Sequence, residues 1–68
     1  MNDLKIKSEF IRLDQALKFM GIAQTGGHAK MMIIDGQVRA NGEVCLMRGK
    51  KLRPGDIIKT QDNEFTIS

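Results

Sequence analysis

The chain has 68 residues, of which 41% are hydrophobic, and its formal net charge at pH 7 is +3. This length allows one domain with a small core and excludes a deep substrate pocket. Because the single Cys45 excludes a disulfide scaffold and the apolar run of residues 31–34 is far too short to span a bilayer, we expect a cytoplasmic protein with neither a membrane partner nor a small-molecule substrate.

Local sequence patterns predict a strand and two helices in the first half of the chain. Residues 4–7 alternate between apolar and basic side chains, which indicates a short half-buried strand. Apolar residues then recur at helical spacing, which predicts a first helix over about residues 12–20 and a second over about residues 26–35. Thr25 is the predicted N-cap of the second helix, and Gly36 is its predicted stop.

The pair Asn41-Gly42 is the strongest short hairpin signal in the chain, because both residues accept positive φ angles. The apolar residues on either side of the turn are Val38, Ala40, Val44 and Leu46. A strict two-residue turn pairs Ala40 with Glu43 and sets Val44 opposite Arg39. A bulge or a longer loop would therefore be needed to bring all four apolar residues onto one face.

The last third of the chain predicts a turn and two further strands. Residues 53–56, with the sequence Arg-Pro-Gly-Asp, predict the turn, and residues 57–60 and 64–67 predict strands around a second turn at Asp62-Asn63. The predicted fold class is therefore α+β, with a strand, two helices and a small antiparallel sheet in that order.

Positive charge is concentrated in one part of the sequence. Residues 1–35 carry a net charge of +1, residues 36–53 carry +4 and residues 54–68 carry −2, which together give the overall +3. The four bases of the run 48–53 are Arg48, Lys50, Lys51 and Arg53. Such a cluster on a glycine-containing run is suited to phosphate. The alternative is a charged loop that is merely solvated, but the flanking Gly49 and the turn at residues 54–55 indicate that the charges are held in place between two strands.

The predicted start of the second helix, Thr25-Gly26-Gly27, offers unpaired backbone N–H groups and about half a positive charge to an anion. The alternative is that Thr25 is only a cap and that the glycines only relax a turn. Two glycines in a first helical turn each cost about 0.5 to 1 kcal/mol relative to alanine, which favours a functional role. The His28 imidazole at this position is a candidate to hydrogen-bond a sugar or a base edge.

The sequence indicates no catalytic or metal chemistry. One histidine and one cysteine supply no second ligand at metal spacing, and there is no nucleophile–base pair, so we expect neither an enzyme nor a cofactor. Cys45 is predicted to be a small buried hydrophobe, and the methionines that we expect to fill the core are Met20, Met31, Met32 and Met47. With no Trp or Tyr and only three Phe residues, the chain lacks a series of base-stacking platforms.

Five short runs of the sequence together form a recognisable series. They are Arg12-Leu13-Asp14, Ala16-Leu17, residues 25–30, residues 36–42 and residues 52–56. This series resembles the RNA-binding domain named after ribosomal small-subunit protein four, the S-four domain or alpha-L motif, with a core match over about residues 12–58. Residues 26–30 and 48–52 are similar, more specifically, to small free-standing bacterial members. The resemblance then extends to a single domain over residues 1–68.

The resemblance implies two helices packed on a small, twisted antiparallel sheet of four to five strands. It also implies a non-catalytic protein that binds structured RNA, with ribosomal RNA or a ribosome assembly intermediate as the expected target, and we expect a monomer. The candidate RNA-binding residues are Arg12, Thr25, Gly26, Gly27, His28, Lys30, Arg39, Asn41, Arg48, Lys50, Lys51 and Arg53. Many enzyme-linked relatives place an arginine where this chain has Gly26. The alternative function is a protein-interaction adaptor whose basic hairpin docks on an acidic partner.

Overall fold

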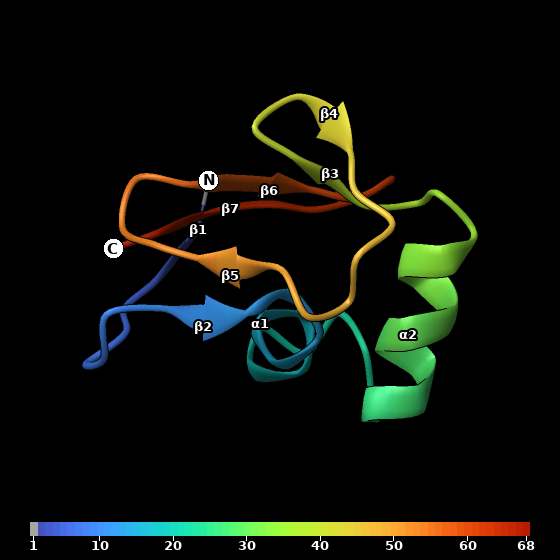
Figure 1. Ribbon diagram of the computed structural model, residues 1–68, viewed down its shortest axis with the longest axis horizontal. Coiled ribbons are helices and arrows are strands. Elements are labelled where there is room, and N and C mark those ends of the chain that lie inside the picture. The colour runs from blue at the N-terminus through green and yellow to red at the C-terminus, as the bar shows by residue number, and fades with distance from the viewer. Residues whose placement is uncertain (1) are drawn as a thin grey trace.

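Residues 2–68 are described by the computed structural model of the chain, drawn in Figure 1. The helices are α1 (Leu13–Phe19) and α2 (Gly26–Ile34), and the strands are β1 (Asn2–Leu4), β2 (Ile11–Arg12), β3 (Arg39–Ala40), β4 (Glu43–Val44), β5 (Lys51–Leu52), β6 (Ile57–Lys59) and β7 (Glu64–Ile67). Five strands form a sheet in the order β1-β7-β6-β3-β4, and β2 pairs separately with β5. The predicted α+β class, with two helices on a small sheet, is confirmed.

The first strand differs from its prediction in both position and direction. It covers residues 2–4 rather than 4–7, and it runs parallel to β7, so the sheet is mixed rather than wholly antiparallel. The pairing continues past β1, because the Ile6 N–H donates to the Ser68 carbonyl and the Ser68 N–H donates to the Leu4 carbonyl, both at 2.9 Å. The alternation of residues 4–7 predicts a strand but not its partner, which is β7 at the other end of the chain.

The core lies between the two helices and one face of the five-stranded sheet. Its largest fully buried side chains are Leu13, Leu17, Ile33, Val38, Leu52, Ile58, Phe65 and Ile67. Strand residues alternate between this face and solvent, as the pleat requires: Ile58 is buried, whereas its neighbours Ile57 and Lys59 are exposed.

The expectation that the methionines fill the core is correct for only two of the four named. Met20 and Met32 are partly buried against the core, but Met31 and Met47 are 58% and 68% exposed. Met31 lies two residues from both Ala29 and Ile33, which are buried, so helical spacing turns its side chain away from them. Cys45 is half-buried at the edge of the core rather than fully buried.

The hairpin adopts the strict two-residue turn without a bulge. Asn41 and Gly42 have φ angles of 54° and 88°, and Arg39 stands opposite Val44. Val44 and Leu46 consequently remain exposed, at 47% and 61%. With positive φ at both central residues, the turn has the type I′ pattern, which matches the twist of the two strands. This turn leaves the two apolar side chains unburied.

Both helices begin and end within one residue of their predicted bounds. Thr25 is the N-cap of α2, and Gly36, with a φ of 76°, follows the C-cap Asp35 as predicted. The predicted turn of residues 53–56 is present, because the Asp56 N–H donates to the Arg53 carbonyl at 3.0 Å. Neither α1 nor α2, the helices of residues 2–68, has the length and apolarity that a membrane crossing needs.

Candidate nucleic-acid interface

The start of α2 is held by two local hydrogen bonds. The His28 backbone N–H donates to Thr25 Oγ1 at 3.0 Å, which is the predicted N-cap contact. The Gln24 N–H donates to His28 Nδ1 at 3.2 Å, so the imidazole ring folds back onto the residue before the cap. His28 is therefore partly a capping residue, and Nε2 is the ring atom that remains for a ligand.

The two glycines of this first turn are not required by the fold. A Cβ atom at Gly26 would meet nothing within 4 Å, and one at Gly27 would meet only Thr25 Oγ1 at 3.9 Å. Both residues are exposed, neither has a positive φ, and the first turn of α2 contains no acidic residue. Within residues 2–68 we find no acceptor for the N–H groups of Gly26 and Gly27. These amides face solvent and can be approached closely.

The run that carries Arg48, Lys50, Lys51 and Arg53, residues 48–53, is called here the basic segment. Its backbone is fixed to the start of α1, because the Leu13 N–H donates to the Lys50 carbonyl at 2.9 Å and the Asp14 N–H donates to the Arg48 carbonyl at 3.1 Å. Strand β5 runs through the segment and pairs with β2, so the charges are not held between two strands as predicted but around one. The segment is nevertheless ordered by the protein.

The side chains of the basic segment do not all point the same way. Lys51 lies over the ring of Phe10, with Nζ 5.0 Å from the ring centroid. Lys50 is half-buried and lines a groove together with residues of the β3–β4 hairpin. Arg48 and Arg53 are exposed. Lys50 and Lys51 therefore point to different parts of the surface, which a linear reading of the sequence does not reveal.

Asn41 takes part in a network that joins the hairpin to the 53–56 turn. Its Nδ2 donates to Asp56 Oδ1 at 3.1 Å, and its Oδ1 accepts from the Ile57 N–H at 2.9 Å. Asp56 Oδ2 accepts from the Arg53 N–H at 2.8 Å. This last bond lowers the pKa of Asp56 below its ordinary value of 3.8, aided by the Asn41 amide and the nearby charge of Lys50 and opposed by partial burial. The Asn41 side chain is thus occupied within the protein.

Arg39 lies on the solvent face of the five-stranded sheet. It stands opposite Lys59 on one neighbouring strand and Val44 on the other, and all three are exposed. The next residue, Ala40, is buried on the face that meets the helices. Because successive strand residues point to opposite faces, Arg39 is directed away from α2. The structure therefore does not bring Arg39 together with the Thr25–Lys30 turn.

The remaining candidates are Lys30 and Arg12. Lys30 is exposed on α2 four residues after Gly26, which places both on one side of the helix. Arg12 belongs to β2 and precedes α1, and its Nη2 pairs with Asp14 Oδ2 at 2.9 Å. In the view of Figure 1 the segment between β4 and β5 runs down toward α1. The basic segment is hydrogen-bonded to the start of α1, and α1 packs against α2.

Comparison with known proteins identifies the family. A family model described as S4 domain matches residues 4–68. The chain belongs to this family. It is 37% identical over 60 residues to a probable ribosome maturation protein, RlbA, of Bacillus subtilis, an alignment that covers 88% of this chain and 84% of that protein. It is 33% identical over 54 residues to the small ribosomal subunit protein uS4 of Acaryochloris marina, covering 79% of this chain but 27% of that protein.

Two features of this S4 domain escaped the sequence analysis. One is the Asn41–Asp56 contact, which joins residues 15 positions apart. The other is a groove beside α1 that places Lys5 and Lys7 near Phe19. The alternation of residues 4–7 marked both lysines as solvent-facing, but nothing in the sequence indicated that an aromatic ring would lie beside them.

Proposed function

We propose that this S4 domain is a non-catalytic, monomeric RNA-binding protein of the cytoplasm that recognises structured RNA, either ribosomal RNA or a ribosome assembly intermediate. The observation that carries the proposal is the arrangement around α1. Two backbone carbonyls of the basic segment accept hydrogen bonds from the start of this helix, and Arg48, Lys51 and Arg53 remain exposed. Helix α1 in turn packs against α2, whose first amides are open. The ribosomal names of the two relatives support the choice of target.

The two parts of the surface suit a phosphate chain for different reasons. The start of α2 offers fixed N–H donors and the positive end of the helix dipole, which bind one phosphate closely. The basic segment offers long, mobile cations that contact neighbouring phosphates by charge. The described residues measure only 27 × 21 × 18 Å, so a single folded RNA can reach both parts at once.

The proposal assigns different roles to the candidates. Thr25, Gly26, Gly27, His28 and Lys30 form the helix-start part of the surface, and Arg12, Arg48, Lys51 and Arg53 form the cationic part. Lys50 contributes charge from the hairpin side. Asn41 acts as a positioning residue, because its amide holds the 53–56 turn. Arg39 lies outside this surface, on the solvent face of the sheet.

The direct test is titration of a folded RNA hairpin with the protein at several salt concentrations. Neutralising about four phosphates gives a slope of log affinity against log salt of roughly −3 to −4. We expect a slope in this range for the wild type. A flat salt response would contradict phosphate-dominated binding.

Charge reversal with a matched control locates the surface. We expect the double variant Arg48→Glu, Lys51→Glu to lose most of its RNA affinity, because two cations of the proposed surface become anions. Lys59→Glu is the control, since Lys59 is exposed on the solvent face of the sheet beside Arg39. An equal loss per reversed charge in the control would move the RNA surface to that face.

A protein-adaptor function is the second candidate, favoured by the exposure of Leu46 and Met47 directly before Arg48. Apolar side chains bordered by arginine are common in protein interfaces. Recovery of the protein from lysate with and without ribonuclease distinguishes the two functions, because an adaptor keeps its partner after the RNA has been digested.

A further inference from the structure

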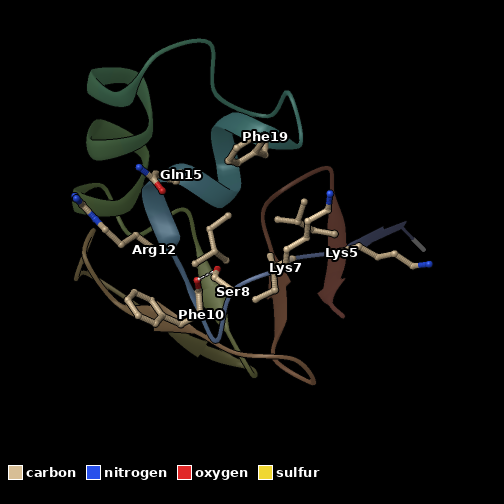
Figure 2. Close-up of a pocket in the computed structure, with 10 residues that line it drawn as sticks. Lys5, Lys7, Ser8, Phe10, Arg12, Gln15 and Phe19 are labelled. Carbon is tan, nitrogen blue, oxygen red and sulfur yellow. Dashed lines mark hydrogen bonds between the residues drawn. The ribbon is translucent and has the colours of Figure 1, made fainter.

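A groove of about 310 Å³ lies between residues 4–8 and helix α1. In Figure 2 Gln15 and Phe19 stand on the helix along one side, and Lys7 and Ser8 stand on the opposite side. A second groove, of about 290 Å³, is lined by Gln15, Lys18 and Phe19. Gln15 and Phe19 therefore border both grooves, and Phe19 is the aromatic residue that they share.

Phe19 is 72% exposed, unlike the other two aromatic residues of the chain. Phe65 is buried in the core, and Phe10 is 36% exposed with Lys51 over its ring. A single exposed apolar residue is ordinary. What sets Phe19 apart is that its ring stands between two hollows, with the Gln15 amide four residues earlier on the same side of the helix.

The charged side chains that line the two grooves are all basic. Four of the residues that line them are basic, namely Lys5, Lys7, Arg12 and Lys18, and none of the lining residues is acidic. The one salt bridge among residues 2–68 joins Arg12 to Asp14, so none of the three lysines is in an ion pair there. A negatively charged ligand with a flat apolar part fits this combination better than a neutral or positively charged one.

The grooves are continuous with the surface proposed above. Arg12 lines the first groove and stands opposite Lys51 of the basic segment in the β2–β5 pair. Phe10, which also lines the groove, lies beneath Lys51. A polynucleotide bound along the basic segment would therefore reach the groove without leaving the protein surface.

We propose that Phe19 stacks against an unpaired nucleotide of the bound RNA, with its base in the groove beside α1 and its flanking phosphates near Lys7 and Lys18. The inference rests on the proposed function and extends it from phosphate contact to selection of an unpaired base. Every base has a flat face, so stacking selects an exposed base rather than a base of one kind. The Gln15 amide both donates and accepts, which lets it pair with the edge of any base.

The test compares two RNA hairpins that differ by one bulged nucleotide, 2-aminopurine, whose fluorescence falls when it stacks. We expect the wild type to bind the bulged hairpin more tightly and to quench the probe. Phe19→Ala removes the ring and should weaken binding of the bulged hairpin roughly 5- to 150-fold, the range for loss of one stacked base, without changing binding of the paired hairpin. Phe19→Trp should retain both the preference and the quenching.

Controls separate failure of this inference from failure of the proposed function. Met31→Ala removes another exposed apolar side chain, on α2, and should leave the preference for the bulge unchanged. If the wild type binds both hairpins equally with a steep salt dependence, and Phe19→Ala behaves like it, the stacking inference is wrong and the RNA-binding function stands. If neither hairpin binds, both are wrong. Loss of a protein partner by Phe19→Ala, with RNA binding unchanged, would assign the ring to a protein contact and overturn the inference.

Discussion

The two helix N-termini of this protein satisfy their first amides in opposite ways. At α1, the N–H groups of Leu13 and Asp14 donate to the carbonyls of Lys50 and Arg48. The next N–H, that of Gln15, donates to Asp14 Oδ1 at 2.8 Å. The positive end of this helix is thus closed by backbone carbonyls and by a carboxylate.

At α2, the side chain of Thr25 accepts one N–H, and the N–H groups of Gly26 and Gly27 have no acceptor within residues 2–68. No carboxylate lies in this first turn. The segment that closes α1 presents its cations to solvent, while the first turn of α2 keeps its partial positive charge uncompensated, as the proposed RNA contact requires.

The largest effect is expected when the first turn of α2 receives a carboxylate, as the first turn of α1 has in Asp14. Gly26→Glu places a carboxylate in the first turn, where the fold leaves room for a side chain. We expect the free energy of unfolding to rise by about 1 kcal/mol, because glycine is replaced and the helix dipole gains an anion. RNA affinity should fall roughly 10- to 100-fold, since charge-assisted hydrogen bonds to a phosphate are lost. Urea unfolding and RNA titration measure the two effects.

The neutral variant Gly26→Gln is the matched control for side-chain size. It should gain stability from helix propensity and lose less RNA affinity than Gly26→Glu. If Gly26→Glu is more stable than the wild type and binds RNA with the same affinity, Gly26 does not contact the RNA.

The second prediction concerns Asp56, which holds the C-terminal end of the basic segment through the Arg53 N–H. Asp56→Asn retains one oxygen and replaces the other by a donor, so one of the two accepted hydrogen bonds is lost. We expect a loss of about 1 to 2 kcal/mol in the free energy of unfolding at pH 7. Because the folded pKa lies below 3.8, the carboxylate stabilises the fold above that pH and ceases to do so as the pH falls through the lowered folded value.

Urea unfolding of both proteins from pH 7 down to pH 2 checks this sign. The wild type should lose stability below about pH 4 more steeply than Asp56→Asn, and the two curves should converge at the acidic end. Parallel curves would show that the Asp56 carboxylate is not coupled to folding.

The third prediction tests the Thr25 N-cap of α2. Thr25→Ala removes the acceptor for the His28 N–H and should lower the free energy of unfolding by about 1 kcal/mol. RNA affinity should decrease modestly, because the first turn of α2 frays and its amides are no longer fixed. Thr25→Ser, which keeps the hydroxyl, should behave like the wild type in both measurements. A destabilised Thr25→Ser would indicate that the methyl group, not the cap, matters.

Of the contacts at the two helix starts, only the cap of α2 was predicted from the sequence. The cap at Thr25 and the bounds of α2 were predicted correctly, because caps and helical periodicity depend on neighbouring residues. The closure of α1 was not predicted, because its acceptors Arg48 and Lys50 lie more than 30 residues along the chain. Asn41 was assigned to the site by the family resemblance, and its contact with Asp56, which joins two separate turns, was not predicted either.

Arg39 is a different case, because its placement was available from the sequence. Val38 and Ala40 on either side of it are apolar and both are buried. In a strand, that alternation directs the residue between them to the opposite face. The sequence analysis instead considered the net charge of +4 over residues 36–53. A net charge describes a whole segment and does not show on which face of the sheet each side chain lies.

The smallest expected effect concerns Arg12, which lies at the closed helix start and pairs with Asp14 there. Its side chain is 48% exposed, so Arg12→Ala should change the free energy of unfolding by less than about 0.5 kcal/mol. RNA affinity should fall only a few-fold, because Asp14 already offsets part of the Arg12 charge. Asp14→Asn frees that charge while keeping an oxygen for the Gln15 N–H, and it should raise RNA affinity by a similar factor. Equal affinity in all three proteins, measured at low salt, would place Arg12 outside the RNA surface and leave it as a structural partner of α1.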